Sequence, residues 1–109
     1  MVQFVWEFSV RADKIREFER SYSSAGPWAE LFRKSPGFRG TTLLRDTENE
    51  RRFLTIDCWE SIAAQLAMRE QFALEYYELD RACEELTEAE RRVGIFEEPS
   101  FGEIPTTTA

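Results

Sequence analysis

The chain has 109 residues, 42% hydrophobic and 14% aromatic, so it has room for one folded domain with an aromatic-rich core. It contains no histidine, which excludes Ser-His-Asp and Cys-His triads and every histidine-ligated zinc, iron or haem site. Its net charge of −7 divides into +2 over residues 1–54 and −9 over residues 55–109. An excess of this sign repels phosphate backbones and anionic lipids, so we expect neither a nucleic-acid nor a membrane partner.

The N-terminal segment has the alternation of a strand, because apolar side chains at Val2, Phe4, Trp6, Phe8 and Val10 are separated mostly by polar ones. It lacks the basic region and long apolar stretch of a signal peptide, and nowhere do 18 apolar residues run together. We therefore expect a soluble, cytoplasmic protein. Cys58 and Cys83 lie in segments with apolar periodicity, where cysteines are usually reduced core residues.

Helical spacing follows the first strand. Asp13 is a plausible N-cap for a helix over residues 13–24, and Gly26-Pro27 interrupts the pattern before a second helical segment that ends at Ser35-Pro36-Gly37. Residues 38–45 and 52–59 then read as two strands, and the polar residues 46–50 have the length of a hairpin loop. The sequence thus predicts an antiparallel hairpin in the middle of the chain.

The second half begins with Ser61 as a candidate N-cap. From there, apolar residues at three- and four-residue steps up to Leu86 predict one long helix, or two with a bend. Thr87 and Glu90 have the spacing of a capping box for a short last turn, and residues 93–96 predict a final strand. Residues 98–109 hold two prolines and three threonines and are expected to form a tail.

The resulting order, β-α-β-β-α-β, is the ferredoxin-like α+β arrangement, a four-stranded antiparallel sheet with strand one between strands three and four. We assign the domain to residues 1–97 and the tail to residues 98–109. Helices cover one face of such a sheet, so we expect a homodimer in which a second copy covers the other face. Phe101 and Ile104 are the apolar residues through which the tail could reach the partner.

The two faces of the third strand differ in polarity. Leu54, Ile56 and Cys58 are uniformly apolar and are predicted to lie under the helices, which leaves Asp57 on the open face. We further predict that the hairpin pairs Leu43 with Phe53, Thr41 with Thr55, and Arg39 with Asp57. On this register the open face forms a mixed polar and aromatic cavity lined by Glu7, Arg39, Thr41, Thr55, Asp57 and Trp59.

Each candidate side chain has a functional and a structural interpretation. Asp57 is either a general base or the partner of Arg39 in a structural ion pair. Glu7 is either a second carboxylate of an acid–base pair or a solvated edge of the cavity. Trp59 either stacks on a flat substrate or caps the core or the dimer interface. Tyr22 and Trp28, on either side of the Gly26-Pro27 break, either present a hydroxyl and a ring at the cavity mouth or pack a helix against the sheet. No phosphate loop, dinucleotide fingerprint or cysteine-rich metal site is present, so we expect no metal and no cofactor.

Several short motifs, in order over residues 2–97, resemble the antibiotic biosynthesis monooxygenase family of dimeric α+β barrels. They are Gly26-Pro27-Trp28-Ala29-Glu30-Leu31-Phe32, Pro36-Gly37-Phe38-Arg39-Gly40-Thr41, Leu43-Leu44-Arg45-Asp46, Ile56-Asp57-Cys58-Trp59-Glu60-Ser61 and Glu75-Tyr76.

The resemblance implies a cofactor-independent monooxygenase acting on a flat aromatic or polyketide-like molecule. By that analogy Asp57, or else Glu7, would be the base, Arg39 the cation beside a phenolate, and Trp59 and Trp28 the stacking rings. The alternative is a non-catalytic dimeric barrel that binds a small hydrophobic ligand or serves a structural role.

Overall fold

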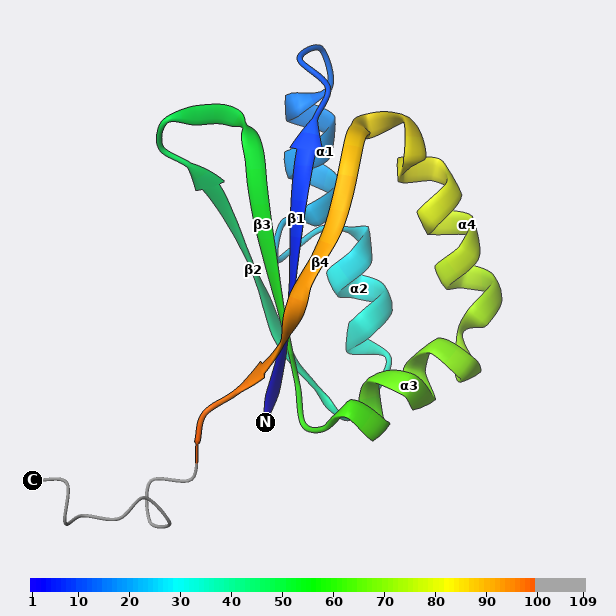
Figure 1. The fold of residues 1–109 in the computed structure, drawn as a ribbon. Helices are drawn as coiled ribbons and strands as arrows, with labels where there is room; N and C mark the ends of the chain where they lie inside the picture. The colour runs from blue at the N-terminus through cyan, green and yellow to red at the C-terminus, as the bar shows by residue number, and fades with distance from the viewer. Residues whose placement is uncertain (100–109) are drawn as a thin grey trace, which may run out of the picture.

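The computed structural model describes residues 1–99, which form one antiparallel sheet and a layer of helices (Figure 1). The sheet has four strands in the order β2-β3-β1-β4, as the ferredoxin-like arrangement predicted. The strands are β1 (Val2–Val10), β2 (Phe38–Asp46), β3 (Asn49–Trp59) and β4 (Thr87–Glu97). The suggestion that the tail reaches a partner through Phe101 and Ile104 concerns residues outside the described part of the chain.

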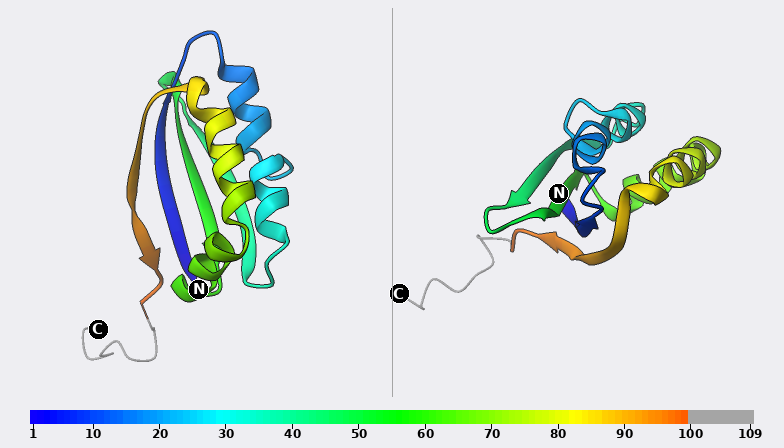
Figure 2. Two further views of the ribbon diagram at one scale, coloured as in Figure 1. Left: turned by 90° about the vertical axis from the view of Figure 1, so that its right-hand side faces the viewer. Right: turned by 90° about the horizontal axis from the view of Figure 1, so that it is seen from above.

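All the helices lie on the same side of the sheet, and its other side carries no helix in the described part of the chain (Figure 2). They are α1 (Ile15–Tyr22), α2 (Pro27–Arg33), α3 (Ile62–Gln71) and α4 (Ala73–Cys83), followed by a single 3₁₀ turn, η1 (Glu84–Leu86). Pro27 is the first residue of α2, and the hydroxyl of Ser61 caps α3 by accepting a hydrogen bond from the Ala64 N–H at 3.0 Å. Both helix starts agree with the sequence.

Two element boundaries differ from prediction. The predicted cap of α1 is wrong, because the helix begins after Lys14 and no side chain caps it. The helical stretch after Ser61 follows the second of the two predicted alternatives, two helices with a bend, which lies at Phe72, whose ψ of 33° leaves the helical range. The predicted capping box at Thr87 is also wrong, since β4 begins there. β4 is an edge strand, in which charged side chains are tolerated because one side of the strand is solvated.

The faces of β3 are the reverse of the prediction. Asp57 lies opposite Phe4, and Thr55 lies opposite Trp6, so these four side chains share one face of the sheet. That face lies under the helices, where Phe4 is 6% and Thr55 3% exposed. Asp57 is therefore beneath the helices. The polarity pattern predicted the wrong buried face, because the side chains that point away from the helices, Leu54, Ile56 and Cys58, are all apolar.

The hairpin register is shifted by two residues from the one predicted. Thr41, not Arg39, lies opposite Asp57, and Leu43 lies opposite Thr55. The connection is shorter than expected, with only residues 47–48 between the strands, because the Asp46 carboxylate accepts a hydrogen bond from the Glu48 N–H at 2.8 Å. A second irregularity, between Phe38 and Gly40, removes Arg39 from the regular ladder. Gly40 has a φ of 119°, a conformation that favours glycine.

Aromatic side chains fill the space between the helices and the sheet. The most deeply buried large side chains, each less than 2% exposed, are Trp59, Phe18, Phe53, Met68 and Val10. Both cysteines are free thiols, as expected from the sequence. Within residues 1–99, no helix has the length and apolar character needed to cross a membrane.

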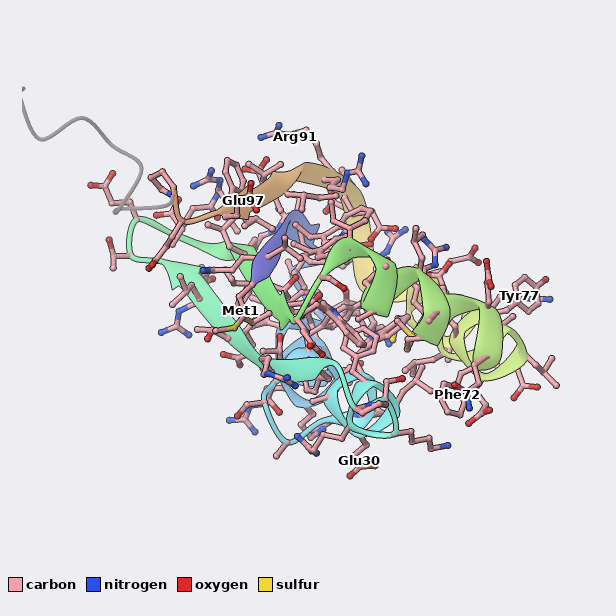
Figure 3. All side chains as sticks on the ribbon, turned by 90° about the horizontal axis from the view of Figure 1, so that it is seen from below. Met1, Glu30, Phe72, Tyr77, Arg91 and Glu97 are labelled. Atoms are coloured by element: carbon pink, nitrogen blue, oxygen red, sulfur yellow. The ribbon has the colours of Figure 1, made fainter. Side chains whose placement is uncertain are left out.

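We use the term helix-free face for the sheet side chains that point away from the helices. Its apolar part consists of Val5, Leu44, Leu54, Ile56 and Phe96. Leu44 and Phe96 remain 46% and 52% exposed. Its charged part is a chain of ion pairs in which Arg52 bridges Asp46 and Glu7, and Glu7 also binds Arg91. Arg91 projects from β4 away from the helices (Figure 3).

Candidate functional site

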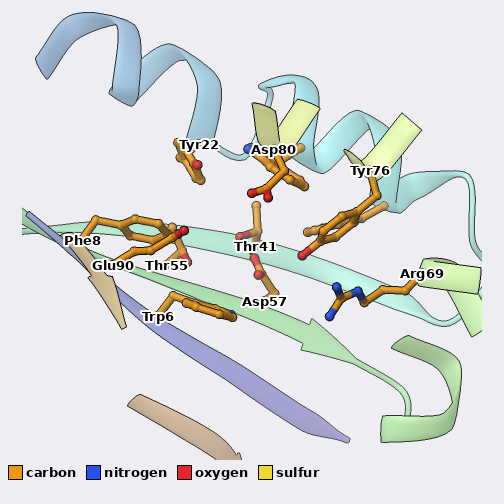
Figure 4. A pocket seen from close by; sticks show the side chains of 12 residues that line it. Trp6, Phe8, Tyr22, Thr41, Thr55, Asp57, Arg69, Tyr76, Asp80 and Glu90 are labelled. Carbon is orange, nitrogen blue, oxygen red and sulfur yellow. Dashed lines mark hydrogen bonds between the residues drawn. The ribbon is translucent and has the colours of Figure 1, made fainter. Parts of the chain in front are cut away.

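A cavity of about 200 Å³ lies between the sheet and the helices (Figure 4). Its walls are mainly aromatic and come from β1, α1, α2 and α4: Trp6, Phe8, Tyr22, Trp28, Phe32 and Tyr76. Its polar side chains come from β2, β3, α3, α4 and β4: Thr41, Thr55, Asp57, Arg69, Asp80 and Glu90. A flat apolar molecule with a few polar groups would match this lining.

A second cavity of about 160 Å³ adjoins the first, and the two share five lining residues: Trp6, Phe32, Asp57, Arg69 and Tyr76. Arg92 of β4 and Gln65 of α3 line only the second cavity, as does Trp59. Asp57 therefore stands between the two, in reach of a ligand in either. We call them the first and the second cavity.

Asp57 is the carboxylate at the centre of this site. Within the described residues its one hydrogen bond comes from Thr41, whose hydroxyl donates to Oδ1 at 2.5 Å. Burial raises the pKa of Asp57 from 3.8 to about 6, and the hydrogen bond from Thr41 opposes this rise. A carboxylate with such a pKa can accept a proton near neutral pH, as a general base must.

Two of the predicted catalytic residues lie elsewhere. The guanidinium of Arg39 donates to the Pro36 carbonyl at 2.8 Å and forms an ion pair with Glu60 at 3.5 Å, so the predicted pair with Asp57 does not form. Glu7 lies on the helix-free face, where hydrogen bonds from Arg52 and then Arg91 hold the pKa of its carboxyl below the usual value. Neither side chain lines either cavity.

The predicted substrate-binding residues divide between the two cavities. Tyr22, Trp28, Thr41 and Thr55 line the first, although on the side of the sheet opposite to the one expected. Trp59 lines the second but is only 1% exposed, so most of its ring belongs to the core. The Trp28 indole N–H is buried and has no hydrogen-bond acceptor among residues 1–99. Burial raises the pKa of Tyr22 well above its usual range, which keeps the phenol protonated.

Sequence reasoning did not assign the other lining residues of the first cavity to the site: Trp6, Phe8, Phe32, Arg69, Tyr76, Asp80 and Glu90. The Arg69 guanidinium lies over the Tyr76 ring, 4.6 Å from its centroid, and the Tyr76 ring meets Trp28 edge-on at 5.0 Å. Figure 4 shows Arg69 and Glu90 on opposite sides of Asp57. The helical spacing of Phe72, Tyr76 and Leu79 was the available signal, since it places Tyr76 on the inner side of α4.

Comparison with known proteins agrees with this architecture. Residues 1–75 match the family described as antibiotic biosynthesis monooxygenase. The chain belongs to this family, whose members share the α+β ferredoxin-like fold seen here. A search of curated proteins found no match.

Solved structures extend the likeness to most of the chain. A mutant of SnoaB, a cofactor-independent oxygenase from Streptomyces nogalater, is 25% identical with a TM-score of 0.76, over 91% of this chain and 93% of that one. A conserved protein from Methanosarcina mazei is 13% identical with a TM-score of 0.69, over 90% of this chain and 92% of that one. The latter shows similarity of fold alone.

Proposed function

We propose that the protein is a cofactor-independent oxygenase that acts on a flat, hydroxylated aromatic molecule. The observation that carries the proposal is Asp57, a half-buried carboxylate of raised pKa at the centre of an aromatic cavity. Family membership and the likeness to SnoaB support the reaction class. The aromatic lining supports a ring-shaped substrate, because rings gain from stacked and edge-on contacts with Trp, Tyr and Phe.

The proposed reaction requires two things from the protein: a base and an enclosed site. Asp57 would remove the phenolic or enolic proton, and the resulting electron-rich anion would pass electrons to O₂. For an anthrone, one oxygen atom becomes the new carbonyl at the methylene carbon, and the other leaves as water with the two methylene hydrogens. Thr41 would hold the Asp57 carboxylate in place through its hydrogen bond.

A homodimer is the second part of the proposal. Apolar side chains of the helix-free face, including Leu44 and Phe96, stay about half exposed in one copy of the chain. Exposed apolar surface on a sheet is expected to be covered by a partner. If two copies pack their helix-free faces together, the apolar part of each face becomes buried. Light scattering should give about twice the mass of the chain at micromolar concentration; a monomer would contradict this part.

Oxygen uptake by the purified protein tests the function directly. The substrates are a panel of hydroxylated anthrones and naphthols, with no flavin or metal added. We expect uptake that Asp57→Asn lowers roughly 100-fold, as the loss of a general base does. Glu50→Gln, which removes an exposed carboxylate from the same strand, is the matched control. Ring binding without oxygen uptake would favour the non-catalytic alternative.

A further inference from the structure

Two arginines line the second cavity, Arg69 from α3 and Arg92 from β4. Within residues 1–99, neither forms an ion pair or donates a side-chain hydrogen bond, whereas Arg52 and Arg91 are both paired with Glu7. The Arg69 guanidinium lies over the Tyr76 ring, an arrangement that leaves the N–H groups at its edge able to donate. Among the described residues that line this cavity, Asp57 is the other charged one, so the two guanidinium groups leave an excess of positive charge, which an anion matches best.

Asp57 and Arg69 line both cavities, and the charged side chains that the cavities do not share differ in sign. The polar groups around Asp57 in the first cavity include the carboxyl groups of Asp80 and Glu90. Burial first, and then the neighbouring carboxylates of Asp80 and Glu84, raise the pKa of Glu90. The charged side chain that lines only the second cavity is Arg92, beside Phe4, Ile62 and Leu66. A ligand that spans both would therefore bind in one orientation.

We propose that the substrate carries a carboxylate, which binds Arg69 and Arg92 in the second cavity while the hydroxylated ring lies beside Asp57 in the first. The inference rests on the proposed function and adds the substrate class: aromatic acids rather than neutral phenols. A planar guanidinium can bind a carboxylate through two parallel hydrogen bonds, so this pair also fixes the position of the ring. The net charge of −7 would otherwise oppose the entry of an anion.

The test is a binding measurement and needs no turnover. Three ligands are compared: a hydroxynaphthoic acid with its hydroxyl and carboxylate at opposite ends, the methyl ester of that acid, and the parent naphthol. Dissociation constants come from calorimetry, since the many cavity tryptophans and tyrosines complicate fluorescence. We expect the acid to bind about tenfold more tightly than the ester, the effect of one charge-assisted contact in partly exposed surroundings.

Variants assign the preference to its residues. Arg92→Gln and Arg69→Gln should each remove most of the preference for the acid over its ester, because the ester has no charge for a guanidinium to bind. Arg92→Lys should retain part of the preference for the acid, because lysine keeps the positive charge but not the planar pair of donors. Arg16→Gln, which removes an exposed arginine of α1, changes the net charge equally and should leave all three constants unchanged.

Equal binding of the acid and the ester would overturn the inference, as would an acid preference that survives in both glutamine variants. Absence of binding by all three ligands would overturn it too. Naphthol binding without any acid preference would leave the cavity as the proposed active site, so this failure differs from failure of the oxygen-uptake experiment. Far-ultraviolet circular dichroism and urea unfolding show that each variant is folded.

Discussion

Replacing Asp57 by Asn should stabilise the protein at the same time as it removes activity. Folding moves the pKa of this carboxyl from 3.8 to about 6, chiefly because burial disfavours the charged form. This rise in the pKa corresponds to about 3 kcal/mol between the two protonation states of Asp57. This is an upper value, since the carboxylate is only half-buried and keeps its hydrogen bond from Thr41.

The sign of the pH dependence follows from proton linkage. The folded protein binds the Asp57 proton more tightly than the unfolded chain does, so the charged carboxylate costs stability as pH rises through the interval from about 4 to about 6. Asn carries no charge and escapes this cost, yet its amide oxygen can still accept the Thr41 hydrogen bond. The free energy of unfolding of Asp57→Asn relative to wild type should therefore increase by about 1 kcal/mol between pH 5 and pH 8.

Urea unfolding at several pH values measures this difference. Glu50→Gln serves again as the control, because its exposed side chain should give a difference that hardly changes over the same range. If the stability advantage of Asp57→Asn over wild type, measured as free energy of unfolding, became smaller as pH rises, the predicted pH dependence would be wrong. An Asn variant that is less stable than wild type at pH 8 would also contradict the prediction, because Asp57 would then be a paired structural carboxylate.

Three further predictions concern the neighbours of Asp57 and the sheet. Thr41→Val removes the hydrogen bond that opposes the raised pKa of Asp57, so the pH of half-maximal oxygen uptake should move upward; an unchanged pH profile would show that Asp57 is not the titrating base. Trp28→Ala empties part of the cavity wall and should lower the free energy of unfolding by about 3–5 kcal/mol, with Trp28→Phe losing less, as urea titration would show. Ile56→Lys places a charge on the apolar part of the helix-free face and should give a monomer in light scattering, whereas persistence of a dimer would place the interface elsewhere.

Most of the fold could be predicted because its signals are local. The alternation of β1, the proline that begins α2 and the serine that caps α3 each act within a few residues, and the element order then determines the sheet order. β4 was predicted too short because its first half, from Thr87 to Arg92, has no apolar alternation. An edge strand is held by backbone hydrogen bonds to its neighbour, which a side-chain pattern does not report.

Correct prediction of the site depended on the pairing register of the strands, which is not determined by local sequence. Asp57 was identified as the key carboxylate, together with Thr41 and Thr55, but its face and its partner were wrong. One tight turn after Asp46 shifted the pairing by two residues and replaced Arg39 by Thr41 beside Asp57. Asp80 and Glu90 were missed for a related reason, since only the packing of α4 beside β4 brings these distant carboxyls to one cavity.

The ion pairs of the helix-free face bear on how two copies would associate. Asp46, Arg52, Glu7 and Arg91 already neutralise one another within a single chain. Their charges therefore offer little to a second copy, and the free energy of association has to come from the apolar part of the same face. Added salt screens attraction between separate charges but strengthens the burial of apolar surface when the salt is a sulfate. The dimer should consequently tighten in ammonium sulfate and barely weaken in sodium chloride, the opposite of an assembly held together by ion pairs between its subunits.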